Sequence, residues 1–304
     1  MTATPTPLER APASLAGGRF VLLKREDAHP LGAFKWRGAL PTLEAYRGRG
    51  AAGVVTASTG NHGAATAWAA QRLGISATVY VPPGASAAKV ALIRSLGAAL
   101  REAGDDFDSA KAAAREFADA NRLPLFEDGD EPEQYAGYGA IAREILAQSP
   151  APPFAVVVPV GNGALIGGIG EVLRREAPGT LVVGAVAKDA PVMDRSWRAR
   201  RVVAHDRAAT FADGLAVRVA VPRAVGILAR VVDRMELVSE REIARGVGRF
   251  AAAGIRVEGA AGAAAAVLGR LPDSSGPIVL VATGRNIDEA LWRRAVEAPE
   301  SFPD

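Results

Sequence analysis

Short apolar segments alternate with longer segments of helical character along much of this chain. A strand pattern at residues 52–56 precedes a helical pattern at 62–73, and a second strand at 77–81 ends at Pro82. Parallel strands are usually joined through a helix, so this alternation predicts βαβ units and an α/β fold. The further strands expected are 98–102, 123–126, 154–159, 181–187 and 277–282, and the further helices are 86–96, 106–120, 131–148, 164–176, 240–253 and 259–271.

The length of the chain favours more than one domain. At 304 residues it exceeds the usual size of a single hydrophobic core. Hydrophobic residues make up 49% and charged residues 23%, a composition typical of globular proteins. The proline-rich segment 150–153 interrupts the chain after a helical pattern. We therefore expect two domains, with a crossing near this segment.

One lysine differs from the others in its surroundings. Lys35 follows Phe34 and a loop that contains Gly32, whereas Lys89 and Lys111 fall in helical surface patterns. The chain has 36 basic residues, of which five are lysines, so chemistry that needs a primary amine has few candidates. Taken alone, Lys35 fits a surface lysine at a helix start equally well.

Two glycine-containing segments each lie between a predicted strand and a predicted helix. Gly161-Asn162-Gly163-Ala164-Leu165 offers backbone N–H groups and a helix N-terminus to an anion. A dinucleotide is disfavoured there, because Ile166 occupies the position of the third glycine. Ser58-Thr59-Gly60-Asn61-His62-Gly63 offers hydroxyls as well, although Ser58 or Thr59 could equally cap the following helix.

Taken together, these segments resemble the fold type II pyridoxal-phosphate enzymes of the serine/threonine dehydratase (ammonia-lyase) family. The family pattern Gly-Ser-Phe-Lys-x-Arg-Gly-Ala is matched from Gly32 to Ala39, with Ala33 where serine is usual. The Ser58 and Gly161 segments follow in family order, and so does Thr283-Gly284-Arg285-Asn286. The Gly161 segment usually has four consecutive glycines, so Asn162 and Ala164 are departures.

The resemblance implies pyridoxal phosphate as the cofactor and assigns roles to individual residues. It implies cofactor binding by Phe34, Lys35, Asn61, Gly161, Asn162, Gly163, Ala164, Leu165, Glu258 and Thr283. It implies substrate binding by Ser58, Thr59, Asn61, His62 and Tyr138, and catalysis by Lys35 and Thr59. The implied architecture has two domains, as in the tryptophan synthase β-like fold, each an open, mostly parallel sheet flanked by helices. Residues 1–45 with 149–304 would form the large cofactor-binding domain, and 46–148 the small domain with the substrate carboxylate loop.

The expected reaction is β-elimination from a β-hydroxy α-amino acid such as threonine, serine or phenylserine. Thr283 matches the family residue that meets the pyridine nitrogen, and a neutral hydroxyl there favours elimination or β-replacement over transamination. Thr59 leaves racemization open, because some racemases of the family carry a hydroxyl at this position. Tyr138 stands where some diaminopropionate ammonia-lyases have tyrosine. A non-catalytic nucleotide-binding α/β protein is the alternative from another class.

Composition and charge argue against several other classes of protein. The 36 basic residues nearly balance 33 acidic ones, and no aromatic pattern accompanies the basic cluster at 195–201, so we expect no nucleic-acid partner. The chain has no cysteine, and its three histidines lack ligand spacing, so we expect no metal site. No signal peptide or membrane span is evident. We expect a cytoplasmic protein, as a homodimer.

Overall fold

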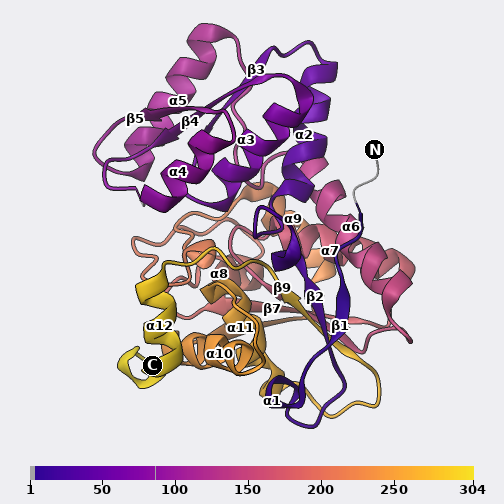
Figure 1. Ribbon diagram of the computed structural model, residues 1–304. Helices are drawn as coiled ribbons and strands as arrows, with labels where there is room; N and C mark the ends of the chain where they lie inside the picture. Colours follow the sequence, from indigo (N-terminus) through magenta and orange to yellow (C-terminus); the bar gives the residue numbers. More distant parts are fainter. Residues whose placement is uncertain (1–3, 86) are drawn as a thin grey trace. The chain divides into compact units, whose positions relative to one another are not determined.

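The computed structural model describes residues 4–85 and 87–304 and divides the chain into two compact units (Figure 1). Unit 1 takes the chain as far as Phe34 and again from Tyr138 to Asp304, and unit 2 is Lys35–Gly137. Unit 1 is therefore discontinuous in sequence. The domain boundaries expected from the sequence, at 45/46 and 148/149, stay a prediction.

Unit 1 is built on a six-stranded sheet with the strand order β1-β2-β9-β6-β7-β8. The strands are β1 Leu8–Arg10, β2 Val21–Arg25, β6 Ala155–Pro159, β7 Leu181–Ala187, β8 Arg234–Val238 and β9 Ile278–Ala282. β1 is antiparallel to β2, and all the other neighbours are parallel. β6 and β9 are wholly buried, as expected for parallel strands covered on both faces.

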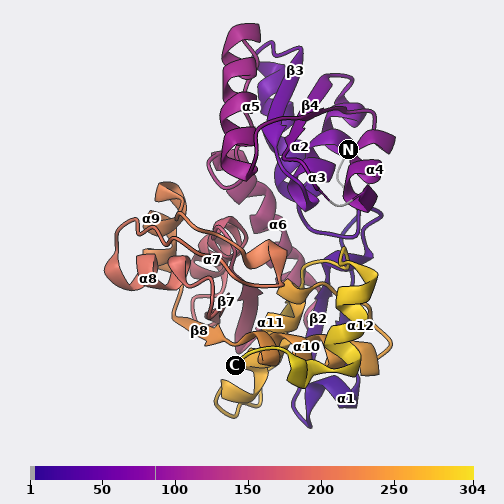
Figure 2. The same ribbon diagram turned by 90° about the vertical axis from the view of Figure 1, so that its left-hand side faces the viewer.

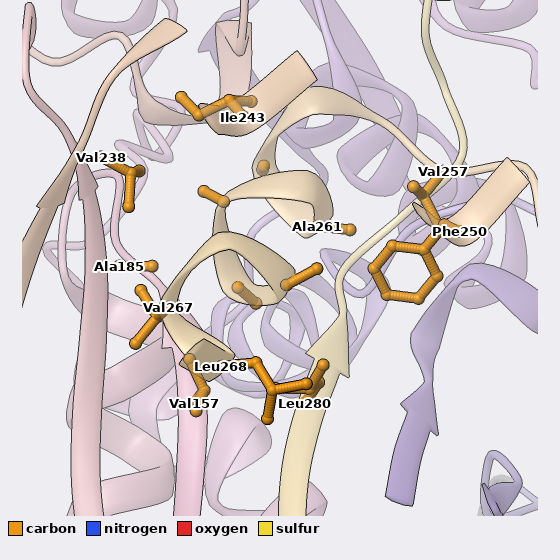
Figure 3. Close-up of a cluster of buried hydrophobic side chains, with 14 of the residues drawn as sticks. Val157, Ala185, Val238, Ile243, Phe250, Val257, Ala261, Val267, Leu268 and Leu280 are labelled. Carbon is orange, nitrogen blue, oxygen red and sulfur yellow. The ribbon is translucent and has the colours of Figure 1, made fainter. Parts of the chain in front are cut away.

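Helices accompany this sheet in the order expected for βαβ units. They are α1 Ala13–Ala16, α7 Ala164–Glu176, α8 Val192–Ala199, α9 Pro222–Val231, α10 Glu240–Ala252, α11 Gly259–Val267 and α12 Glu289–Glu297, together with the later part of α6 Pro132–Gln148. Side chains of α10 and α11 pack with strand residues such as Val157, Ala185 and Leu280 in one hydrophobic cluster (Figure 3). This cluster packs against one face of the sheet of unit 1.

Unit 2 has a smaller sheet of three parallel strands in the order β3-β4-β5. The strands are β3 Gly53–Ala57, β4 Ser76–Val81 and β5 Ala99–Glu102, and the helices are α2 Trp36–Gly48, α3 Asn61–Leu73, α4 Ala87–Ser95 and α5 Phe107–Asn121. One face of α5 is lined by Ala110, Ala114 and Ala118, all buried. Asp106 caps this helix by accepting a hydrogen bond from the Ser109 N–H at 2.9 Å, which fixes where it begins.

Most of the expected elements are confirmed, and the α/β class with mostly parallel sheets is confirmed with them. The strand expected at 123–126 is wrong: this segment makes a single bridge, between Leu125 and Val55 of β3. Pro124 accepts a hydrogen bond from the Val55 N–H but has no N–H of its own, so a continuous ladder cannot form. The local sequence patterns did not predict β1, β2, β8, α1, α2, α8, α9 or α12.

The close contact of α10 and α11, seen side by side in Figure 2, depends on glycine. A Cβ atom on Gly246 would lie 2.0 Å from the Gly262 carbonyl oxygen, which is backbone and cannot move aside alone. Nothing lies within 4 Å of a Cβ atom on Gly248, two residues further along the same helix. The two glycines therefore have different roles.

We expect Gly246→Ala to lower the free energy of unfolding by about 2 kcal/mol, because the added methyl forces α11 away from α10. Gly248→Ala is the matched control and should raise it by up to about 1 kcal/mol through helix propensity. Urea denaturation followed by circular dichroism measures both. Equal effects of the two substitutions would contradict the packing argument.

Candidate active site

Lys35 lies at the start of a helix, as the residue before Trp36, the first of α2. The loop leading to it is fixed within unit 1, because Ala33 bridges to Gly284 and the Phe34 N–H donates to the Thr283 carbonyl at 3.0 Å. Gly32 has a φ of +67°, and a Cβ atom there would lie 2.5 Å from Asn286 Oδ1. A glycine is therefore required three residues before Lys35.

Within unit 2 the Lys35 ammonium forms an ion pair with Asp128. Asp128 Oδ1 also accepts a hydrogen bond from Gln134 Nε2 at 3.1 Å and lies 3.7 Å from His62 Nδ1. Lys35 and His62, two residues singled out from the sequence, thus meet at the same carboxylate. Asp128 itself was missed by the sequence analysis.

His62 is a buried ring behind this carboxylate. Its Nε2 lies 3.2 Å from the Phe126 carbonyl oxygen, and its ring centroid is 4.4 Å from that of Phe126. Burial lowers the pKa of His62, and the nearby Lys35 charge acts in the same direction, whereas Asp128 opposes them. His62 is therefore a neutral ring near pH 7, which argues for a packing and backbone role over that of a general acid.

The Ser58 to Gly63 segment connects β3 to α3 in unit 2. Ser58 Oγ accepts a hydrogen bond from the Gly60 N–H at 3.2 Å, and Gly60 is the N-cap of α3. The capping expected from Ser58 or Thr59 is therefore not the one observed. Gly60 has no side chain that could accept a hydrogen bond from the N–H groups of the first turn. These N–H groups have no acceptor within the helix. This end of α3 suits an anionic group.

The Gly161 to Leu165 segment connects β6 to α7 in unit 1. Gly163 has a φ of +89° and is the N-cap of α7, and Asn162 Oδ1 accepts a hydrogen bond from the Ala164 N–H at 3.0 Å. A Cβ atom on Gly161 would lie 2.2 Å from the Gly214 carbonyl oxygen. The segment therefore closes against the Gly214 backbone and keeps its own backbone at the start of a helix, as a phosphate cradle requires.

Thr283 follows the last residue of β9 and is 1% exposed. Its Oγ1 donates a hydrogen bond to Glu258 Oε1 at 2.8 Å, and Glu258 is 2% exposed. The Glu258 N–H donates to the Gly284 carbonyl at 2.9 Å. Thr283 and Glu258, which the resemblance implies as cofactor-binding residues, are thus joined by a hydrogen bond in which the threonine hydroxyl is the donor.

Tyr138 lies in the part of α6 that belongs to unit 1, and its side chain is fully buried. Its ring packs edge-on against Phe34 with centroids 5.2 Å apart. Tyr138 therefore supports the residue that precedes Lys35. Phe34 and Tyr138 lie far apart in the sequence, so no local pattern predicts this contact.

The burial of Lys24 is a second feature that was not predicted from the sequence. This lysine of β2 is 0% exposed and donates to the Thr6 carbonyl at 2.7 Å and to Glu144 Oε2 at 2.5 Å. A buried charge needs such partners. Over residues 4–85 and 87–304, no cluster of three or more histidines, acidic residues or cysteines could hold a metal ion, and no helix is both long and apolar enough to cross a bilayer.

Comparison with known proteins identifies the family. A family model described as pyridoxal-phosphate dependent enzyme matches residues 1–284. The chain belongs to this family. Its cofactor is pyridoxal phosphate, so the alternative of a non-catalytic nucleotide-binding protein is set aside.

Several relatives have related names. L-threonine ammonia-lyase of Geobacter sulfurreducens is 35% identical over 272 residues, which cover 88% of this chain and 67% of the relative. The biosynthetic L-threonine dehydratase of Pasteurella multocida is 34% identical over 244 residues, 80% of this chain and 47% of the relative. This chain thus matches about half the length of the Pasteurella protein.

Solved structures show the same fold. The processed form of threonine deaminase isoform 2 from Solanum lycopersicum has a TM-score of 0.92 at 30% identity, over 97% of this chain and 88% of that one. Maize serine racemase has a TM-score of 0.88 at 25% identity, over 98% and 93%. Diaminopropionate ammonia lyase from Escherichia coli, at 22% identity, shares the fold.

The neutral state of His62 gives the folding free energy a pH dependence. The unfolded chain protonates this histidine near the ordinary pKa of 6.5, whereas burial lowers the pKa in the folded state. Below about pH 6.5 the unfolded state therefore binds the extra proton, and the free energy of unfolding falls as the pH falls.

We expect His62 to contribute up to about 1.4 kcal/mol per pH unit to the fall in the free energy of unfolding of the parent protein. His62→Gln should lack this contribution. Urea denaturation between about pH 7.5 and about pH 5.5 measures it. Gln71→Ala removes an exposed, non-titrating side chain of the same helix, and this control should keep the parent pH dependence. A His62→Gln protein with the parent slope would show that His62 is protonated in the folded state.

Proposed function

We propose that this enzyme eliminates water from a β-hydroxy α-amino acid, with threonine, serine or phenylserine as candidate substrates, to give a 2-oxo acid and ammonia. The observation that carries the proposal is the 35% identity to an L-threonine ammonia-lyase over 88% of the chain. Relatives named threonine dehydratase from yeast and plants support it.

The residues of unit 1 fit the phosphate and the ring nitrogen of the cofactor. The segment from Gly161 to Leu165 would bind the phosphate through backbone N–H groups at the start of α7. The Thr283 hydroxyl donates to Glu258 at 2.8 Å in this structure and would turn its proton towards the ring nitrogen of the bound cofactor. Phe34 would lie beside the cofactor, supported by Tyr138.

The residues of unit 2 supply the amine and an anion site. Lys35 would carry the cofactor, and Asn61 would contact it. The N-terminus of α3, with Ser58, Thr59 and the His62 N–H, would bind the substrate carboxylate through hydroxyl and backbone donors. Tyr138 belongs to unit 1 and is proposed to shape the substrate site through Phe34.

Lys35 would then act on protons. Bound pyridoxal phosphate supplies an electron-accepting ring that makes the α-proton of the substrate acidic. With substrate bound and the Lys35 amine free, Nζ would be the base that removes this proton. The resulting ammonium would donate a proton to the departing hydroxyl, so that water leaves.

The character of Thr283 favours elimination. A carboxylate in direct contact with the ring nitrogen would keep that nitrogen protonated and spread negative charge over the ring. Thr283, the residue after β9, instead offers a neutral hydroxyl, which would donate to the ring nitrogen without protonating it. Loss of a β-substituent is then favoured over transamination.

Racemization is the second candidate, because Thr59 places a hydroxyl at the start of α3 where it could return a proton to the α-carbon. The structural similarity to maize serine racemase supports this candidate. β-Replacement and ammonia loss from a diaminopropionate-type substrate would use the same amine. These reactions differ in their products, so product analysis separates them.

The first test concerns Lys35. Lys35→Ala should abolish both turnover and covalent trapping of the cofactor by borohydride, because the amine that joins the cofactor is gone. Mass spectrometry of the borohydride-treated parent enzyme should place the cofactor mass on the peptide containing Lys35. Lys111→Ala, which changes a partly exposed lysine of unit 2, is the control and should keep both properties. Trapping on a different lysine would overturn the assignment.

The second test separates elimination from racemization. With L-serine we expect pyruvate and ammonia to form while little D-serine appears, since elimination needs a proton transfer on the lysine side alone. Thr59→Ala should reduce any D-serine further and leave release of the 2-oxo acid largely intact. Chiral chromatography of recovered serine, beside a 2-oxo acid assay, measures both. Rapid D-serine formation with little pyruvate would make racemization the main reaction.

Assembly and location complete the proposal. We propose a homodimer, as the family resemblance implies, which light scattering after size-exclusion chromatography tests. We propose a cytoplasmic location for this chain, although some relatives bear the names mitochondrial and chloroplastic.

A further inference from the structure

The proposed cofactor lysine is held by a carboxylate that the sequence analysis did not single out. The Lys35 ammonium pairs with Asp128 Oδ2, 93 residues later in the chain. The Lys35 side chain is 16% exposed and that of Asp128 is 26% exposed. Because both are largely shielded from water, this contact is stronger than a pair on an open surface.

Asp128 is itself fixed from behind. Its second oxygen, Oδ1, accepts a hydrogen bond from Gln134 Nε2 at 3.1 Å, and Gln134 Oε1 accepts one from the Gly129 N–H at 2.8 Å. Tyr135 donates its hydroxyl proton to the Gly129 carbonyl at 2.8 Å. The start of α6 therefore holds both the carboxylate and the backbone next to it. One oxygen of Asp128 is fixed, and the other faces Lys35.

His62 lies near the Asp128 carboxylate but does not neutralise its negative charge. Its Nδ1 is 3.7 Å from Asp128 Oδ1, beyond a normal hydrogen bond. Burial lowers the pKa of His62, so the ring carries no full charge near pH 7. Of Lys35 and His62, Lys35 is therefore the residue that brings a full positive charge to Asp128.

We propose that Asp128 is a positioning residue that holds the Lys35 amine whenever this amine is not joined to the cofactor. The proposal rests on the proposed role of Lys35. The Lys35 amine is free in the cofactor-free protein. It is free again during each turnover, while the cofactor holds the substrate and not the lysine. In both states a fixed carboxylate limits where a long, flexible side chain can go.

The cofactor-free protein and the working enzyme should respond in opposite directions to loss of this carboxylate. Attachment joins the Lys35 nitrogen to the aldehyde carbon of the cofactor, and the aldehyde oxygen leaves as water with two of the three ammonium protons. The ion pair with Asp128 must break first, so Asp128 slows attachment. During turnover the same contact keeps the amine in place, so Asp128 favours catalysis.

The first experiment measures attachment. Cofactor-free parent protein, Asp128→Asn and Asp130→Asn are mixed with pyridoxal phosphate, and the rate of the visible absorbance change is recorded, with borohydride trapping on Lys35 as the end point. We expect Asp128→Asn to attach the cofactor about two- to fivefold faster than the parent. Asp130→Asn, an exposed acid of the same loop, is the matched control and should attach at the parent rate.

The second experiment measures turnover of the cofactor-loaded proteins. We expect Asp128→Asn to lower kcat by about 10-fold or more, with KM changed by less than about threefold, because the amine is misplaced while substrate binding persists. Asp128→Glu keeps the charge and should recover part of kcat together with slow attachment. Urea denaturation checks that each variant is folded.

The opposite signs distinguish positioning from a structural role. If Asp128→Asn attaches the cofactor no faster than the parent, or keeps the parent kcat, the inference is wrong. Slower attachment together with lower stability would show that Asp128 only maintains the fold, and would also overturn it. Failure of the parent protein to trap cofactor on Lys35 would instead overturn the proposed function.

Discussion

The position of β9 between β2 and β6 is the constraint on which the rest of unit 1 depends. Parallel pairing brings the carboxyl ends of these strands to one edge of the sheet, where α/β proteins place their ligands. Val157 of β6 pairs with Leu280, so the Gly161 segment and Thr283 emerge at this same edge. Arg25 of β2 pairs with Ala282 and directs the loop towards Phe34. A shift of one residue in β9 would reverse the faces of all its side chains.

Small residues allow this sheet to be covered closely. α11 consists largely of alanine and glycine, and its residues are almost all buried. The backbone of α10 approaches that of α11 at Gly246 and Gly262, which leaves no room for a Cβ atom. Dispersion contacts over such a wide, dry surface stabilise the strands whose ends carry the proposed site. The alanine-rich composition is thus a packing requirement.

Charge is handled differently in the two units. In unit 1, the buried Lys24 is paired with Glu144 and a backbone oxygen, and Glu258 accepts a hydrogen bond from Thr283. These contacts stabilise fixed structure. In unit 2, the Lys35–Asp128 pair is less deeply buried than Lys24, and its cation belongs to the residue proposed to carry the cofactor. In the proposed mechanism this ion pair must form and break. Gln134 holds one oxygen of Asp128 in place, so the other oxygen stays in position to receive the Lys35 amine each time.

The sequence by itself determined the α/β class, the family and most strands and helices that contain strong apolar patterns. It did so because strand and helix periodicity and the glycine segments are local signals, readable within a few residues. It missed β2, whose apolar pattern includes Lys24, and α2, whose start at Trp36 has no capping side chain. Tertiary structure alone decided that Asp128 meets Lys35, that Tyr138 packs on Phe34 and that residues 123–126 form a single bridge. Each of these depends on residues distant in sequence or on the partner strand, and no local pattern encodes such a contact.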